Sequence, residues 1–100
     1  MSDMHLRLSD AAKWIEGARI QGDASALINR VHTDSRSVQA GDLFIALQGE
    51  RFDAHDFLAQ VSQGGASVAM VVNGKANTNL PCIEVADTRK GLGQLAKGWR

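Results

Sequence analysis

The segment of residues 34–57 reads DSRSVQAGDLFIALQGERFDAHDF and joins two polar stretches through one strongly apolar stretch. The apolar residues 43–47 show no alternation and have a glycine nearby on either side, which is typical of a β-strand covered on both faces. Covered strands belong to α/β layers, where loops at the strand ends carry ligand-binding groups. We therefore expect a site beside this strand, with Ser35 and Arg36 on one side and residues 50–52 on the other.

The rest of the chain alternates helical and strand patterns. We expect helices over residues 8–17, 54–63 and 87–100, and further strands over residues 18–21, 28–33, 67–72 and 82–85. In the strand of residues 28–33, Ile28 and Val31 are expected to face inward at an imperfect period. Strands that alternate with helices predict an α/β fold, with a small mixed sheet and helices on its faces.

Capping residues and apolar spacing define the expected helices. Ser9 is the expected N-cap of the first helix and Asp53 that of the second, while Asp87 is a plausible N-cap of the third. In the second helix, Phe57, Leu58 and Val61 are expected to share one apolar face. The third helix repeats apolar residues at helical spacing.

The composition describes an ordinary folded domain. The chain has 100 residues, 11 of them basic and 11 acidic, so no net charge attracts nucleic acid or an anionic membrane. Cys82 is the single cysteine, which excludes an internal disulfide and agrees with a reducing compartment. No apolar run approaches the ~20 residues of a membrane span, and the N-terminus lacks a signal-peptide pattern. We predict a cytoplasmic protein with no membrane span and no nucleic-acid partner.

Sequence signals for catalysis are weak. There is no G-x-x-x-x-G-K-S/T phosphate loop, and the pair Gly74 and Lys75 alone cannot cradle a nucleoside triphosphate. No Ser-His-Asp or Cys-His set is indicated, and no cluster has metal-ligand spacing. Asp53, His55 and Asp56 resemble a catalytic cluster, but we expect them to cap the helix and to form local hydrogen bonds.

A purely structural interpretation is open for the polar residues before the central strand. Asp34 would close an Asx turn, and Arg36 would pair with Asp34 or with Asp42. His32 would be a solvent-facing or locally hydrogen-bonded strand residue. Metal binding by His32 is not expected, because no second histidine or cysteine lies nearby in the sequence.

The segment D-S-R-x4-G-D-L-F-I-A-L-x-G-E-R-F-D-A-H-D-F resembles the N-terminal domain of the Mur ligases, which build peptidoglycan precursors. The resemblance also includes the helix end at residues 64–66 and the apolar strand that follows it, and it extends from about Leu6 to the last residue. The D-S-R and G-D-L-F parts are shared by the MurF and MurE types. The E-R-F-D-x-H-D-F continuation favours the MurF type, which adds D-alanyl-D-alanine.

The resemblance implies a division of labour between domains. Residues 1–86 would form an N-terminal domain that binds the UDP part of UDP-N-acetylmuramoyl-tripeptide, and the helix of residues 87–100 would lead towards a central ATP-binding domain outside this chain. The whole enzyme would form an amide bond through an acyl phosphate, with ATP and Mg²⁺ held by other domains. This fragment alone is expected to be inactive.

The resemblance also implies which residues contact UDP. They are Thr33, Ser35, Arg36, Glu50, Arg51 and Phe52. Thr33 and Ser35 would surround the uracil, because the base offers two carbonyl acceptors and one N–H donor to backbone and hydroxyl groups. Phe52 would lie against the base or ribose. Arg36 or Arg51 would face the diphosphate through charge-assisted hydrogen bonds.

Two other functions fit the same residues. One is the corresponding domain of a MurE-type ligase, which adds the third amino acid of the peptide. The other is a noncatalytic module that binds UDP-sugars or another protein. A G-T-x-G-K-T-like loop soon after residue 100 would exclude the module, and the remaining sequence would distinguish the two ligases.

Overall fold

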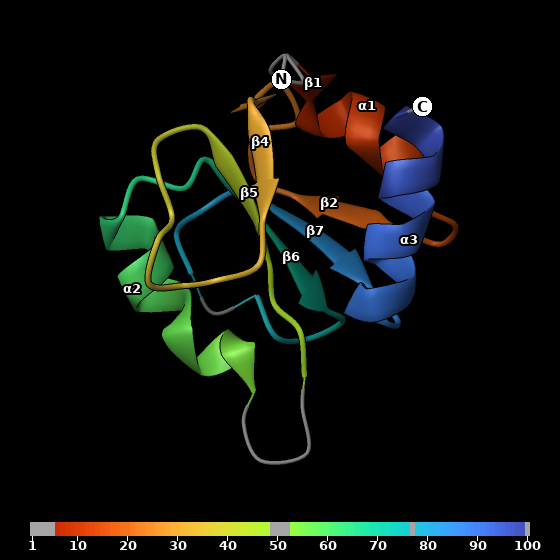
Figure 1. The fold of residues 1–100 in the computed structure, drawn as a ribbon. Helices are drawn as coiled ribbons and strands as arrows, with labels where there is room; N and C mark the ends of the chain where they lie inside the picture. The colour runs from red at the N-terminus through yellow and green to blue at the C-terminus, as the bar shows by residue number, and fades with distance from the viewer. Residues whose placement is uncertain (1–5, 49–52, 77, 100) are drawn as a thin grey trace.

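The computed structural model describes residues 6–48, 53–76 and 78–99. A β-sheet lies between α2 on one face and α1 with α3 on the other, as Figure 1 shows. The elements in chain order are β1 (Leu6–Arg7), α1 (Leu8–Lys13), β2 (Arg19–Gln21), β3 (Leu27–Ile28), β4 (Arg30–His32), β5 (Asp42–Ile45), the 3₁₀ helix η1 (Ala54–Phe57), α2 (Leu58–Gln63), β6 (Val68–Val72), β7 (Cys82–Val85) and α3 (Thr88–Trp99).

The main sheet is mixed, as the sequence predicted. Its strand order is β2-β7-β6-β5-β4. Strands β4 to β7 are parallel to one another, and only the edge strand β2 is antiparallel, with Arg19 opposite Glu84. Strands β1 and β3 form a separate antiparallel pair. The predicted α/β fold class is therefore confirmed.

Strand β5, which lies between β6 and β4, is covered on both faces, and this confirms the prediction from its unbroken apolar run. Leu43 and Ile45 belong to the core under α1 and α3, whereas Phe44 and Ala46 belong to the core under α2. All four have no exposed surface. Because side chains alternate between the faces of a strand, both faces must be apolar here.

The predicted strand of residues 28–33 is two strands in two sheets. Ile28 pairs with Leu6, whereas Val31 pairs with Leu43. Between them, the Asn29 N–H donates to the carbonyl of Gly41 at 2.8 Å. The imperfect inward period therefore has a physical cause, because the two apolar residues belong to different sheets.

The first helix is shorter than predicted and begins before its predicted cap. It spans α1 only, so Ser9 lies within its first turn and is not the N-cap. The first N–H groups of a helix need partners outside the helix. Here the N–H groups of Leu8 and Ser9 donate to the carbonyls of Ala26 and Ala24, both at 2.9 Å. Backbone groups thus replace the hydroxyl cap.

The second helix begins as η1 and continues as α2. Asp53 is its N-cap, as predicted, and its carboxylate accepts from the His55 N–H at 2.9 Å. Leu58 and Val61 are buried as predicted, but Phe57 is 39% exposed. Because a 3₁₀ turn has about three residues, Phe57 is turned away from the face that Leu58 and Val61 share.

The third helix is capped by Asp87, as predicted, whose carboxylate accepts from the N–H groups of Arg89 and Lys90. Its first turn is also tied to the sheet, because the buried Thr88 hydroxyl donates to the carbonyl of Ala46 at 2.8 Å. This bond joins the start of α3 to the residue that follows β5.

Two glycines allow α3 to approach its neighbours closely. A Cβ atom at Gly91 would lie 2.7 Å from the sulfur of Met70, and one at Gly98 would lie 2.7 Å from Cβ of Trp14 and collide with its indole. Leu95, between them, is 1% exposed. The helix therefore packs on the sheet and on the Trp14 side chain through its glycine face.

This contact predicts opposite effects for alanine at two positions of α3. Gly98→Ala is expected to lower the free energy of unfolding by about 1–3 kcal/mol, because the new Cβ overpacks the contact with Trp14. Gly93→Ala should raise it by roughly 0.5–1 kcal/mol, because its Cβ meets no atom within 4 Å and alanine favours a helix. Urea unfolding measures both changes. Equal effects would contradict the proposed packing.

Candidate functional site

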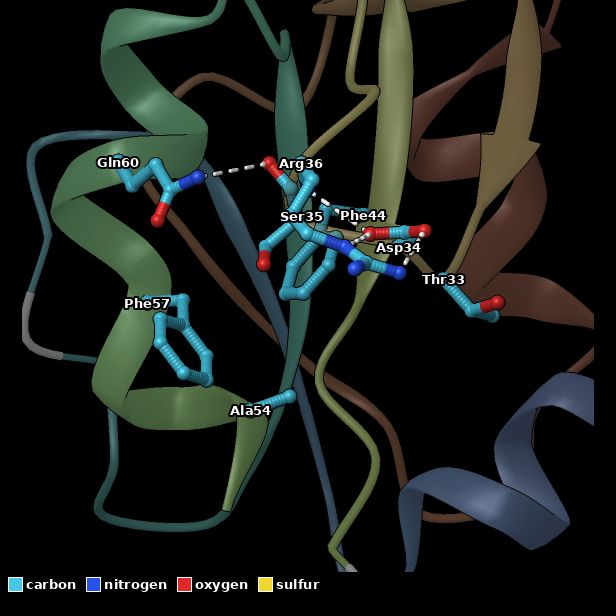
Figure 2. A pocket seen from close by; sticks show the side chains of 8 residues that line it. All are labelled: Thr33, Asp34, Ser35, Arg36, Phe44, Ala54, Phe57 and Gln60. Carbon is cyan, nitrogen blue, oxygen red and sulfur yellow. Dashed lines mark hydrogen bonds and ion pairs between the residues drawn. The ribbon is translucent and has the colours of Figure 1, made fainter. Parts of the chain in front are cut away.

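A cavity of about 530 Å³ lies on the α2 face of the sheet. Figure 2 shows the loop after β4 on one side of it and η1 with α2 on the other. Its lining residues are Thr33, Asp34, Ser35, Arg36, Phe44, Ala54, Phe57 and Gln60. The fully buried Phe44 comes from β5 and lies at its base. The cavity thus combines polar groups from one loop with apolar groups from the core and a helix.

The loop of residues 33–41 makes this cavity possible because it connects two parallel strands without a helix. It leaves the end of β4, crosses the same face as α2 and enters the start of β5 (Figure 1). A loop that crosses a sheet must satisfy its backbone polar groups through side chains or water. Side chains from both strands and from α2 supply several of these partners.

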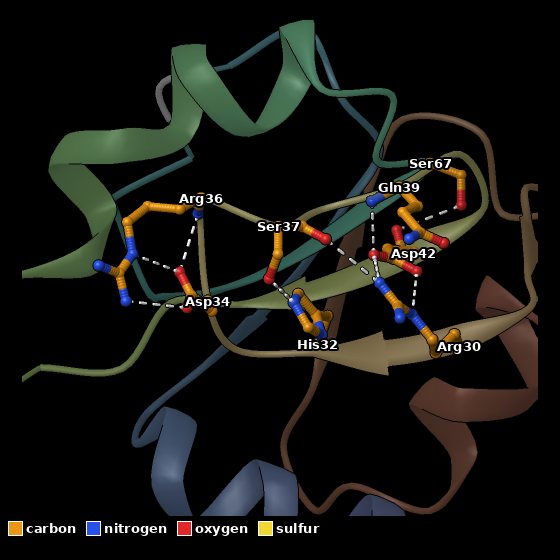
Figure 3. Close-up of polar contacts among 8 residues, drawn as sticks. All are labelled: Arg30, His32, Asp34, Arg36, Ser37, Gln39, Asp42 and Ser67. Carbon is orange, nitrogen blue, oxygen red and sulfur yellow. Dashed lines mark hydrogen bonds and ion pairs between the residues drawn. The ribbon is translucent and has the colours of Figure 1, made fainter.

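Asp42 is the main anchor of the loop. Figure 3 shows its carboxylate between the guanidinium of Arg30, at 2.8 and 2.7 Å, and the Gln39 N–H, at 2.8 Å. The Asp42 side chain is 1% exposed and that of Arg30 is 35% exposed. Burial raises the pKa of Asp42, but the hydrogen bonds from Arg30 and Gln39 hold this pKa below its ordinary value of 3.8. Asp42 is therefore ionised at neutral pH.

Weaker contacts hold the middle of the loop. The His32 ring nitrogen Nε2 lies 2.7 Å from the Ser37 hydroxyl (Figure 3). The Gln60 amide of α2 donates to the carbonyl of Ser35 at 3.5 Å, the long limit for such a bond (Figure 2). The predicted local role of His32 is confirmed. The loop thus contacts both the strand before it and the helix across the cavity.

Asp34 and Arg36 form a local pair at the cavity. The Arg36 N–H donates to Asp34 at 2.9 Å, which closes the predicted Asx turn, and its guanidinium adds two bonds of 3.1 Å (Figure 3). These bonds lower the pKa of the Asp34 carboxyl. The alternative prediction that Arg36 pairs with Asp42 is wrong, because Asp42 pairs with Arg30. The Arg36 side chain is 85% exposed, so it remains accessible to an anion.

Asp53 is the centre of a second polar cluster, beside the cavity. Its carboxylate accepts from the N–H and ring of His55, from Gln48 and from the Lys75 ammonium, the last at 2.8 Å. Burial raises the pKa of Asp53, but the bonds from Lys75 and His55 outweigh it and hold the pKa well below its usual range. The predicted capping role of Asp53 and its local hydrogen bonds with His55 are confirmed, whereas the bond from Lys75 comes from a distant part of the chain.

The structure brings together three of the six residues that were predicted to contact UDP. Thr33, Ser35 and Arg36 all line the cavity. The other three, Glu50, Arg51 and Phe52, lie outside the described residues. The role of all six in binding stays a prediction.

The sequence interpretation missed two residues on the opposite wall. Phe57 was assigned to the buried face of its helix, and Gln60 was not considered, yet both line the cavity. Residues three apart lie on the same side of a helix. With Leu58 and Val61 assigned to the core, this spacing would have placed Phe57 and Gln60 together on another side.

Other reactive groups give no second candidate site among the described residues. Burial raises the pKa of the Cys82 thiol to about 11, so it is not a thiolate at neutral pH. In the described ranges, no three histidine, cysteine, aspartate or glutamate side chains are placed to hold a metal ion. No helix of the described chain is long and apolar enough to cross a membrane.

Comparison with known proteins gives a consistent family. A family model described as "Mur ligase family, catalytic domain" matches residues 27–100. The chain is 45% identical over 82 residues to the UDP-N-acetylmuramoyl-tripeptide--D-alanyl-D-alanine ligase of Escherichia coli, and 39% identical over 83 residues to that of Haemophilus influenzae. These matches cover 82% and 83% of this chain and 18% of each relative.

A ligase named for the addition of 2,6-diaminopimelate is also similar to this chain. The UDP-N-acetylmuramoyl-L-alanyl-D-glutamate--2,6-diaminopimelate ligase of Geobacter sulfurreducens is 38% identical over 95 residues, which cover 91% of this chain and 18% of that protein. This similarity to both types agrees with the sequence motifs that the two types share.

The solved structures agree with the sequences. A crystal structure of MurF from Acinetobacter baumannii matches with a TM-score of 0.82 and 38% identity, over 92% of this chain and 20% of that chain. The chain therefore spans only about a fifth of the length of the relatives it matches. Since the family model covers residues 27–100 and the sequence and fold agree with it, this chain belongs to the Mur ligase family.

Proposed function

We propose that this chain is the N-terminal domain of a MurF-type ligase and that it holds the uridine diphosphate end of UDP-N-acetylmuramoyl-tripeptide. The observation that carries the proposal is the gathering of Thr33, Ser35 and Arg36 around one cavity. The relatives named for D-alanyl-D-alanine addition support the MurF type. A cytoplasmic location, as predicted from the sequence, is part of this proposal.

The cavity has the chemistry that a uridine needs. Uracil is a planar ring with two carbonyl acceptors and one N–H donor, which hydroxyl and backbone groups of the loop at Thr33 and Ser35 can satisfy. The exposed ring of Phe57 offers an apolar surface on the opposite wall, against which a planar base can stack. Arg36 is accessible and supplies a positive charge for a phosphate.

The domain contributes binding and not bond formation. Energy gained on a remote nucleotide can position the reacting carboxylate of the same substrate. The sequence has no G-x-x-x-x-G-K-S/T loop, and the observation that supports a binding role is the cavity with its polar loop. We assign ATP, Mg²⁺ and amide bond formation through an acyl phosphate to other domains of the full-length enzyme.

We propose residues 87–100 as the connecting helix of this domain and not as a separately folded unit. Helix α3 packs on the sheet through Leu95, so it is folded with the rest of this domain. We propose that the chain leads from this helix into the central ATP-binding domain.

A MurE-type ligase is the second candidate. The similarity to the Geobacter sulfurreducens enzyme, at 38% identity over 95 residues, is the observation that favours it. Both candidates use the same UDP end of the substrate, so the cavity would serve either. Assay of the full-length enzyme with D-alanyl-D-alanine and with 2,6-diaminopimelate distinguishes them.

Titration of this chain with UDP tests the binding role directly. We expect NMR amide shifts at residues 33–36 and at Phe57 and Gln60, which face one another across the cavity. Ser35→Ala should weaken UDP binding by about tenfold, because one buried hydrogen bond is lost. Ser62→Ala, which lies outside the cavity lining, is the control. Shifts centred on residues 73–79 would overturn the assignment.

The site loop should depend on Asp42 far more than on Asp34. Asp42→Ala is expected to lower the free energy of unfolding by about 3 kcal/mol, because it leaves the Gln39 N–H and the Arg30 guanidinium without their buried acceptor. Asp34→Ala removes a pair that is exposed to solvent and should cost much less. Urea unfolding of both variants measures the difference, and equal losses would show that Asp42 is not the anchor.

Acid should destabilise the domain through the same carboxylate. A carboxyl group whose pKa is lowered on folding stabilises the fold above its ordinary pKa of 3.8, and this contribution is lost as the pH falls through the lowered value. The free energy of unfolding should therefore decrease as the pH falls below about 4. Asp42→Asn should make this decrease shallower. An unchanged slope in unfolding experiments between about pH 5 and pH 2 would contradict the role of Asp42.

A further inference from the structure

The cluster of Asp53, His55 and Lys75 lies beside the cavity, and none of its members lines it. Asp53 precedes η1, His55 lies within η1, and Lys75 follows β6. The Lys75 ammonium lies 2.8 Å from one carboxylate oxygen of Asp53, and the His55 ring contacts the other. The cluster therefore connects the wall helix η1 with the end of a core strand.

Both ring nitrogens of His55 are occupied. A backbone N–H can only donate, so Nε2 accepts from the Val72 N–H, at 2.9 Å. Nδ1 then carries the hydrogen and donates to Asp53. The side chain is 6% exposed. A buried ring with both nitrogens engaged has none left for a substrate or a metal ion, so its role is to fix η1 against the end of β6.

Lys75 is held in place by the framework of β6 and β7. Its N–H donates to the carbonyl of Val72 at 2.9 Å, and the Gly74 N–H donates to the Glu84 carboxylate of β7 at 2.9 Å. Gly74 has a φ of 83°, which favours glycine at this turn. Gly74 and Lys75 do not form a phosphate-binding loop. They form a turn that holds the Lys75 ammonium next to the Asp53 carboxylate.

The wall of the cavity depends on this anchor. Ala54 and Phe57 of η1 line the cavity, and His55 lies between them in the sequence. η1 has four residues and continues directly into α2, and a helical segment this short needs tertiary contacts to be stable. Besides the cluster, the start of η1 is held by the Ala54 N–H, which donates to the carbonyl of Leu47 at 3.0 Å.

We propose that Asp53, His55 and Lys75 are positioning residues, which fix the η1 wall opposite Ser35 and so set the affinity for the nucleoside without touching it. This proposal rests on the proposed function, because the bound group is the uridine end of the substrate. Loss of the cluster would let Phe57 move away from the base while the core under α2 remains packed.

Substitution of Lys75 gives the decisive test, because its side chain is 43% exposed and the fold does not depend on its burial. Lys75→Met should weaken the binding of uridine and of UDP by the same factor, about tenfold, as expected for loss of one charge-assisted hydrogen bond. Lys75→Arg keeps a cation for Asp53 and should restore most of the affinity. Lys97→Met, on α3, is the control and should bind like the parent chain.

Substitutions of His55 separate its two hydrogen bonds. His55→Asn keeps a donor near the position of Nδ1, and His55→Gln keeps an acceptor near the position of Nε2. Each should give a smaller loss than His55→Ala and should shift the NMR signals of Ala54 and Phe57 before ligand is added. When combined with Lys75→Met, the losses should be less than multiplicative, because the residues act through one network.

The comparison of uridine with UDP decides between positioning and direct contact. A loss for UDP but not for uridine would show that Lys75 meets the diphosphate itself, and this result would overturn the proposal. Unchanged affinity of Lys75→Met for both ligands would also overturn it, while the proposed function would stand. If the parent chain binds neither ligand, the proposed function fails and this inference fails with it.

Discussion

The ion pair between Arg30 and Asp42 is the constraint on which the cavity depends. These residues face each other on β4 and β5, and the chain between these strands crosses the sheet as a loop. Without a helix in this connection, no regular ladder satisfies its backbone, and the Asp42 carboxylate takes over part of that role through Gln39. One buried charge therefore links the pairing of two strands to the shape of the loop that carries Thr33 and Ser35.

The two walls of the cavity are built by different means. The loop wall is fixed by side chains of the strands below it, whereas the η1 wall is fixed by a polar cluster at the end of β6. Between them lies Phe44, which belongs to the core itself. The η1 wall is thus held at the carboxyl end of β6, and the loop wall begins at the carboxyl end of β4, where α/β sheets usually place ligand sites. The anchor of the loop wall, Arg30 with Asp42, lies instead at the starts of β4 and β5.

The sequence predicted much of this arrangement for physical reasons that are local. An unbroken apolar run predicted β5, and Asp53 and Asp87 predicted helix starts, because burial and capping depend on neighbouring residues. Errors occurred where distant contacts decide. Ser9 failed as a cap because the loop around Ala24 and Ala26 supplies carbonyls, and Ile28 pairs in a different sheet from Val31. Phe57 was misplaced for a different reason, because it was grouped with Leu58 and Val61 although its spacing from Gln60 places Phe57 and Gln60 on another side of the helix.

The antiparallel edge strand has a consequence for the order of folding. Among the described strands, β2 pairs only with β7. Arg19 therefore lies opposite Glu84, although the two residues are far apart in the sequence. During synthesis on the ribosome, β4, β5 and β6 can associate as they emerge, whereas β2 has no partner until β7 has been made. This edge of the main sheet therefore cannot close until residues 82–85 have been made.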